Sequence, residues 1–87
     1  MSYTLYFSEQ VKKDALKLER AGLRKKAAAL LDLLEQGPFS PPPPYEKLVG
    51  DLDGFYSRRI NIQHRLVYRV DKVARRVFVE RMWTHYE

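Results

Sequence analysis

Two neighbouring runs of β-branched and aromatic residues, 55–60 and 64–70, restrict the possible folds of this chain more than any other part of the sequence. Such runs favour extended backbone. Asn61 marks the break between them, and a short polar break between two such runs is typical of a hairpin. The sequence therefore predicts two adjacent strands joined by a short turn at the centre of the fold.

These two strands carry four arginines, Arg58, Arg59, Arg65 and Arg69. Because strand side chains alternate between the faces of a sheet, Arg59, Arg65 and Arg69 are expected to share one face and Arg58 to lie on the other. Guanidinium groups on a sheet form a permanently charged surface with forked donors that suit phosphate. Solvated or ion-paired arginines on the wet face of an antiparallel sheet explain the same pattern equally well.

The rest of the chain predicts a first strand, two helices and a last strand. Residues 3–7 read as a strand, and Ser8 as the N-cap of a helix over residues 9–20. Leucines and alanines at helical spacing predict a second helix over residues 23–36, which ends at Gly37 and Pro38. Residues 73–82 read as the last strand.

The order β-α-α-β-β-β predicts a single α+β domain over residues 1–87. We expect a small antiparallel sheet of about four strands, with two N-terminal helices on one face and the arginines on the other. The four prolines at 41–44 are expected to form a stiff connector, in preference to a ligand for a proline-recognising domain. Residues 46–52 are expected to form a loop or one turn of helix.

Composition excludes several classes of site. The chain has no cysteine, and its two histidines lack the spacing of metal ligands, so neither a metal nor another cofactor is expected. No apolar run is long enough to cross a bilayer and no secretory leader is recognisable, so we expect a cytoplasmic protein without a membrane partner. The net charge of +5 suits an anionic partner such as nucleic acid or an acidic protein.

Several polar residues fit the chemistry of RNA cleavage, in which the 2′-hydroxyl of the substrate attacks the neighbouring phosphate. The protein then supplies a base, cations for the pentavalent phosphate and an acid for the leaving 5′ oxygen. The residues of suitable type are a carboxylate, two arginines on adjacent strands and a pair near the end of the sequence: Glu46, Arg59, Arg65, His85 and Tyr86. Taken singly, the carboxylate reads as a surface residue and the final pair as tail residues.

The hairpin also offers candidates for holding an RNA substrate. Arg58, Arg59 and Arg69 carry charges that attract phosphate, and Tyr56 has a ring on which a base can stack. Packing in a small core is the commoner role of any one such ring.

Three motifs together resemble the YoeB/Txe toxins, which belong to the RelE/ParE superfamily of bacterial toxin–antitoxin modules. They are Leu-Asp-Gly-Phe-Tyr-Ser-Arg-Arg-Ile at 52–60, His-Arg-Leu-Val-Tyr at 64–68, and the closing His85-Tyr86. The likeness extends over essentially the whole chain. It implies the RelE-like fold, which is the architecture expected above, and cleavage of messenger RNA in the decoding (A) site of the ribosome.

The resemblance also implies roles for individual residues. Glu46 matches the general base of the family, Arg65 its phosphate-stabilising arginine, and Arg59 a second basic contact. His85 matches the proposed general acid, and Tyr86 the aromatic residue that orients the substrate.

Several positions depart from the pattern of the family, among them residues 82–84 and the long proline run at 41–44. Gln63 stands where some relatives carry an acidic residue, and Tyr56 replaces a common tryptophan. Glu87 follows the usual His-Tyr end and adds a carboxylate beside the proposed acid, which would raise the pKa of the histidine.

The partners implied by the resemblance are the ribosome, messenger RNA and a cognate antitoxin of the YefM/Phd type, expected to be acidic. Operator DNA is expected to be bound only through that antitoxin. The sequence leaves open whether the free chain is a monomer or a homodimer. It also leaves two alternatives to the nuclease, a gyrase-targeting toxin of the ParE type and a catalytically inactive binding partner on the same fold.

Overall fold

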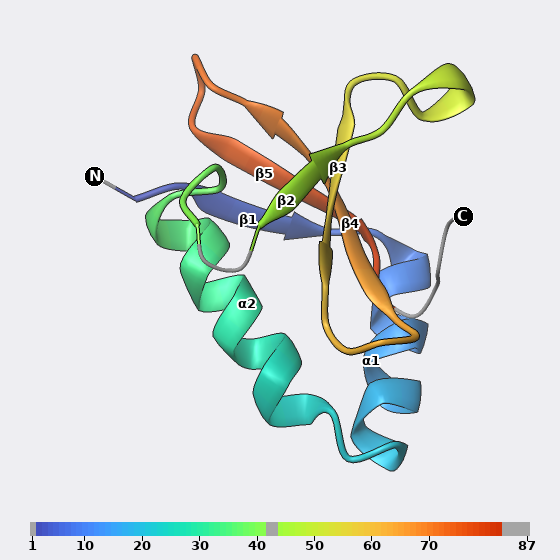
Figure 1. The fold of residues 1–87 in the computed structure, drawn as a ribbon. Helices are drawn as coiled ribbons and strands as arrows, with labels where there is room; N and C mark the ends of the chain where they lie inside the picture. The colour runs from blue at the N-terminus through green and yellow to red at the C-terminus, as the bar shows by residue number, and fades with distance from the viewer. Residues whose placement is uncertain (1, 42–43, 83–87) are drawn as a thin grey trace.

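The computed structural model describes residues 2–41 and 44–82. The described residues form five strands, two α-helices and one short 3-10 helix. In order these are β1 (Thr4–Phe7), α1 (Glu9–Arg20), α2 (Arg24–Gln36), β2 (Tyr45–Lys47), η1 (Gly50–Leu52), β3 (Phe55–Arg59), β4 (Arg65–Asp71) and β5 (Arg76–Arg81). Figure 1 shows both helices on the same side of one twisted sheet. The predicted α+β architecture and helix layer are confirmed.

The sheet has five strands in the order β1-β5-β4-β3-β2, one more than expected. It is also mixed, because β1 pairs parallel with β5 whereas the other strands pair antiparallel. The unpredicted strand is β2, a three-residue edge strand that pairs with β3 directly after the prolines. The prolines that precede β2 have no backbone N–H to donate to a neighbouring strand. An edge position, where only one side of the strand is paired, is therefore compatible with the chain at this point.

Local sequence signals set the limits of α1. Ser8 caps this helix, since its Oγ accepts a hydrogen bond from the Val11 N–H at 3.1 Å, as predicted. The same hydroxyl donates to the Glu80 carbonyl at 2.9 Å, which fixes the start of α1 against β5. Gly22, at φ 75°, then turns the chain into α2.

The hydrophobic core lies between the helices and the sheet. The helices contribute Val11, Leu18, Ala27, Leu30 and Leu34, and the sheet side contributes Ile60, Leu66, Tyr68, Val77, Val79 and Met82. Each fully buried aliphatic side chain of this size contributes about 2 kcal/mol to the free energy of unfolding. Helix α1 packs against β5 and α2 against β1, both on one side of the sheet, so neither described α-helix covers the opposite face.

Candidate functional site

The strand register places three predicted site residues, Glu46, Arg59 and Arg65, on the face of the sheet that no described helix covers. Glu46 of β2 lies opposite Ser57 of β3, and Ser57 lies opposite Val67 of β4. Arg65 of β4 lies opposite Arg59 of β3. Alternation along each strand then puts all of these side chains on one face, which we call the open face. The predicted parity of the hairpin is therefore confirmed.

An ion pair joins the two candidates nearest the centre of this group. Arg65 Nη1 donates to Glu46 Oε2 at 2.9 Å and contacts the buried Ser57 hydroxyl oxygen at 3.4 Å. The Arg65 side chain is only 14% exposed, whereas that of Glu46 is 61% exposed. The guanidinium is thus fixed in the sheet, and the carboxylate beside it faces water. A partly exposed pair of this kind adds little to stability.

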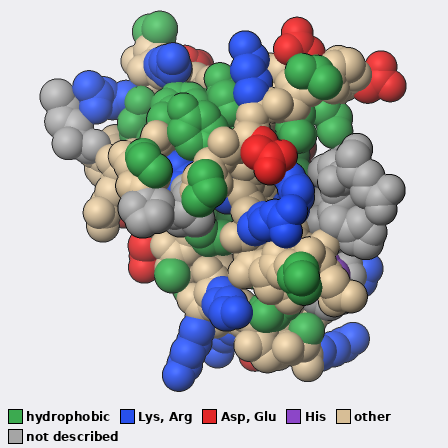
Figure 2. All heavy atoms as spheres, viewed as in Figure 1, with side chains coloured by type: hydrophobic (Ala, Val, Ile, Leu, Met, Phe, Trp, Pro, Cys, Tyr) green, Lys and Arg blue, Asp and Glu red, His purple; other side chains and the backbone are tan. Residues whose placement is uncertain are grey.

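Two further predicted arginines extend the positive charge of the open face. Arg59 is exposed beside Arg65, and Arg69 is exposed on β4 with its guanidinium carbon 4.3 Å from the centre of the Phe78 ring. Figure 2 shows basic side chains around much of the outline of the molecule and an acidic side chain beside basic ones near the middle of the visible face. The arrangement suits a polyanion whose phosphate is attracted by the arginines on the same face as the Glu46 carboxylate.

Arg58, expected as a substrate contact, lies on the other face and is buried. Its guanidinium donates to the carbonyls of Pro38 and Ser40, both at 2.9 Å, and to the Tyr68 hydroxyl at 3.2 Å. Burial raises the pKa of Tyr68, so the phenol keeps its proton and donates to the Pro38 carbonyl. The expected role of Arg58 is therefore corrected: this residue ties the connector after α2 to the sheet.

Tyr56, expected to stack on a base, also lies on the face opposite Glu46. Its ring packs edge-on against those of Phe39 and Tyr45, at 5.0 and 5.9 Å between centroids, and tilted against Tyr68. The ring belongs to a small aromatic cluster of Phe39, Tyr45, Tyr56 and Tyr68, which packs the chain after α2 against the sheet. These contacts favour a packing role for Tyr56, and its stacking on a base stays a prediction.

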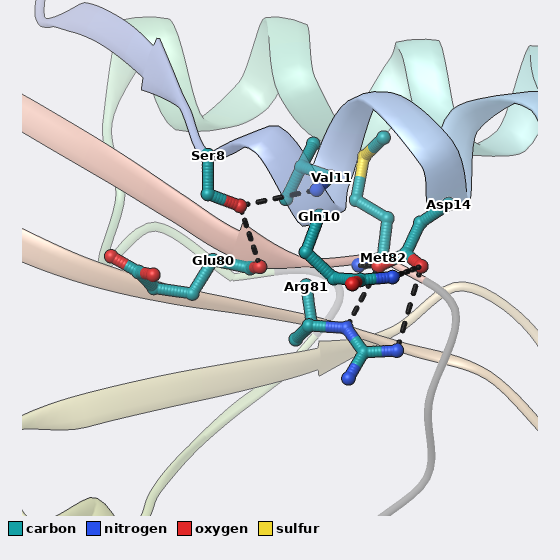
Figure 3. Close-up of polar contacts among 7 residues, drawn as sticks. All are labelled: Ser8, Gln10, Val11, Asp14, Glu80, Arg81 and Met82. Atoms are coloured by element: carbon teal, nitrogen blue, oxygen red, sulfur yellow. Dashed lines mark hydrogen bonds and ion pairs between the residues drawn. The ribbon is translucent and has the colours of Figure 1, made fainter.

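His85 and Tyr86, the expected acid and orienting residue, lie outside the described residues. The described chain ends at Met82, whose backbone N–H donates to Asp14 Oδ2 at 3.0 Å. Asp14 is completely buried and also accepts hydrogen bonds from Arg81 Nε at 2.9 Å and from Gln10 Nε2 at 3.1 Å. Figure 3 shows these groups converging on one carboxylate, which joins α1 to the end of β5.

The environment of Asp14 keeps it ionised. Burial alone would raise its pKa, but the hydrogen bonds from Arg81, Met82 and Gln10 together hold the pKa below its ordinary value. Sequence reasoning did not find this residue. The signal was present, because Asp14 lies three residues after Val11 and four before Leu18, within the apolar stripe of α1. A carboxylate in such a stripe needs a buried cation or several donors.

A shallow cleft of about 300 Å³ is lined in part by Gln10 and Arg81, the two side chains that hydrogen-bond to Asp14. Its walls include Phe55 and Val67 of the sheet, Leu52 of η1, Gln10 of α1 and Arg81 of β5. The lining also includes Ser8 and Glu80, so the cleft combines apolar side chains with one acidic and one basic side chain. Within residues 2–41 and 44–82, no group of three or more metal-ligating side chains is present.

The helices of the described chain give no sign of a membrane span. Neither α1 nor α2 is long and apolar enough to cross a bilayer.

Comparison with protein families gives one match over almost the whole chain. The model of the YoeB-like toxin of bacterial type II toxin–antitoxin systems matches residues 6–86. A curated protein of Mycobacterium bovis named Toxin YoeB is 42% identical over 45 residues. Those residues are 52% of this chain and 53% of that protein, so the match spans about half the length of the curated relative.

Solved structures extend the similarity to the full fold. The YoeB/ParE toxin from Agrobacterium tumefaciens is 32% identical, with a TM-score of 0.85 over 95% of this chain and 99% of that one. The YoeB toxin of Staphylococcus aureus is 31% identical and covers 99% of this chain and 100% of its own. It has been solved in a heterotetrameric YoeB–YefM toxin–antitoxin complex (TM-score 0.79) and as a dimer (TM-score 0.82).

Proposed function

The chain belongs to the family of YoeB-like toxins of bacterial type II toxin–antitoxin systems, and from this we propose that it is a ribosome-dependent endoribonuclease that cuts messenger RNA in the A site. The observation that carries the proposal is the pair of Glu46 and Arg65 on the open face. A carboxylate that can take a proton lies 2.9 Å from a nearly buried guanidinium that can bind the phosphate.

In the proposed reaction, the phosphate of the substrate binds Arg65 and releases Glu46 from its ion pair. Glu46 then takes the proton of the 2′-hydroxyl, and the 2′ oxygen attacks the adjacent phosphorus. Arg65 and Arg59 stabilise the negative charge of the pentavalent intermediate. The bond from phosphorus to the 5′ oxygen breaks, and His85 protonates the leaving oxygen while Tyr86 orients the substrate. The products are a 2′,3′-cyclic phosphate and a free 5′-hydroxyl.

The scaffold also favours an acidic antitoxin as a partner. The Staphylococcus aureus relative forms a complex with YefM, and the present chain has a net charge of +5. The exposed edge strand Tyr45–Lys47 leaves backbone groups for pairing and carries Glu46. An antitoxin of the YefM/Phd type that binds this edge would cover the catalytic carboxylate. It would also supply the contact with operator DNA. Ribosomes and messenger RNA place the activity in the cytoplasm.

The decisive experiment is cleavage of a defined messenger RNA by the purified chain, with and without ribosomes. We expect cuts only with ribosomes, and a rate at least about a hundredfold lower for Glu46→Gln, because the amide cannot accept the 2′ proton. Lys47→Gln is the matched control, since Lys47 follows on the same strand and faces the other side. It should cleave like the native chain.

Two other results would contradict the proposal. Inhibition of gyrase without RNA cleavage would identify a ParE-like toxin, and antitoxin binding with neither activity would identify an inactive partner. Cleavage that survives in His85→Ala would keep the nuclease and remove the histidine from the role of acid.

A further inference from the structure

One row of side chains crosses four strands of the open face. Tyr6 of β1 lies opposite Phe78 of β5, Phe78 lies opposite Arg69 of β4, and Arg69 lies opposite Phe55 of β3. We call these four residues the aromatic–arginine row. Arg76, two residues before Phe78 on β5, lies beside the row on the same face.

Direct contacts hold the row together. The rings of Tyr6 and Phe78 stack with centroids 5.4 Å apart and planes 22° from parallel. The Arg69 guanidinium carbon lies 4.3 Å from the centre of the Phe78 ring, and that of Arg76 lies 5.8 Å from the centre of the Tyr6 ring. Phe78 is half-buried between its two neighbours, whereas Tyr6 remains 43% exposed and both arginines are exposed. Phe78 thus supports a ring and a cation that water can reach.

The row lies next to the proposed catalytic residues. Ser57 follows Phe55 by two residues on β3, and Val67 precedes Arg69 by two on β4. Residues two apart on a strand are about 7 Å apart on the same face, so the row is one step from the residues opposite Glu46. A single RNA strand bound at Glu46 and Arg65 therefore reaches Phe55 and Arg69 within a nucleotide or two. Tyr6 lies two strands beyond Arg69, about 10 Å further across the sheet, so the strand must continue over β5 to reach it.

We propose that the aromatic–arginine row, with Arg76, is a subsite for the single-stranded RNA that flanks the cleaved phosphate, an inference that rests on the proposed function. A base stacks on the Tyr6 ring, and Arg69 and Arg76 bind phosphates on either side of it. Rings interleaved with guanidinium groups match the alternation of base and phosphate in a single strand, and stacking tolerates any base. Arg76 lies near the outer limit of a cation–π contact, so it loses little when it turns to a phosphate.

The test measures binding of a short, fluorescently labelled single-stranded oligoribonucleotide by anisotropy, without ribosomes. All variants are made in the Glu46→Gln chain, which leaves the RNA uncut. We expect Tyr6→Ala to weaken binding about tenfold, the effect of removing one ring on which a base stacks. Phe7→Ala is the matched control, because Phe7 is the next residue of β1, is 44% exposed and faces the other side. It should bind like the parent.

The cations are tested through the salt dependence of the same binding. Arg69→Gln combined with Arg76→Gln should reduce the slope of log affinity against log salt by about two, one for each phosphate that is no longer neutralised. Lys25→Gln combined with Lys26→Gln removes the same charge from exposed positions of α2 and should leave the slope unchanged. Equal slopes for the two double variants would overturn the proposal.

The outcomes separate this proposal from the proposed function. If the native chain cuts RNA on ribosomes but Tyr6→Ala and Phe7→Ala bind RNA equally well, the nuclease stands and the subsite is overturned. If Tyr6→Ala weakens an antitoxin and leaves RNA binding intact, the row is a protein interface and the proposal fails. If no cleavage occurs but Tyr6→Ala alone weakens RNA binding, the row stands as an RNA surface.

Should Tyr6→Ala unfold, Tyr6→Leu keeps an apolar contact with Phe78 without an aromatic face and is expected to weaken binding as much.

Discussion

Asp14 shows how a single buried charge organises one end of the sheet. Its carboxylate is shared by Gln10 on the same helix, by Arg81 on β5 and by the backbone of Met82. The side chain of Arg81 is 34% exposed, so the pair has one partner that water still reaches. The contacts therefore fix the point from which the segment with His85 and Tyr86 continues.

Replacing this charge tests its contribution to stability. We expect Asp14→Asn to lower the free energy of unfolding by about 2 kcal/mol, less than for a fully buried pair because Arg81 is partly solvated. Chemical denaturation at neutral pH measures this loss. Asp32→Asn, at an exposed position of α2, is the control and should be neutral. A neutral Asp14→Asn would show that the amide serves equally well as an acceptor.

Acid should reveal the same contact. The pKa of Asp14 is lowered in the fold, so its stabilisation is complete above the ordinary value of 3.8 and is lost as pH falls through the lowered pKa. Asp14→Asn should therefore remove part of the decline in stability below about pH 4. Parallel acid-denaturation curves for the two proteins would contradict this.

Among the elements, β3 shows what strand alternation predicts and what it leaves out. The two consecutive arginines of this strand point to opposite faces, as parity requires. Parity alone does not say which face a partner covers. The sequence could not reveal that Arg58 is buried. The connector that supplies the carbonyls of Pro38 and Ser40 comes close to β3 only in the folded chain.

The two neighbours therefore predict opposite phenotypes. Arg58→Lys should lower the free energy of unfolding by about 3 kcal/mol, because one ammonium cannot replace a fork shared by two carbonyls and a phenol. Its cleavage rate per folded molecule should stay native. Arg59→Gln should leave thermal stability unchanged and reduce kcat/KM about tenfold by removing charge near the phosphate. Thermal melts and ribosomal cleavage assays on both variants decide the assignment, and swapped phenotypes would refute it.

The sequence predicted the hairpin, both helices and the open face correctly because their signals are local: alternation, helical spacing and caps. It missed β2 because three residues after a proline run carry no periodicity. It missed the row of Tyr6, Phe78 and Arg69 for a different reason. The row exists only where β1 pairs with β5, and no local pattern connects these distant segments.

At the scale of the whole molecule, an excess of positive charge accompanies a candidate site that lies on the surface of a sheet. With a net charge of +5 and its candidate site on an open sheet, it is expected to bind a large anionic surface rather than enclose a small substrate. The ribosome offers such a surface, and its phosphates hold counterions that a basic protein displaces.

Cleavage on ribosomes should therefore depend strongly on salt. At fixed Mg²⁺, we expect log kcat/KM to fall linearly with log K⁺ concentration, and kcat at saturating ribosomes to change little. Arg59→Gln should reduce the slope by about one. A slope of log kcat/KM near zero would mean that surface shape, and not charge, directs the binding of the protein to the ribosome.

The pairing of β1 with β5 has a consequence for when the protein becomes active. Within the described chain β1 hydrogen-bonds to no other strand, so β1 joins the sheet only when β5, which follows it in the sequence, is available. The core between α1 and the sheet is also incomplete until Val77 and Val79 arrive. The proposed nuclease site is therefore complete only after β5 has been synthesised, and the proposed antitoxin, where already present, would meet the chain as it folds.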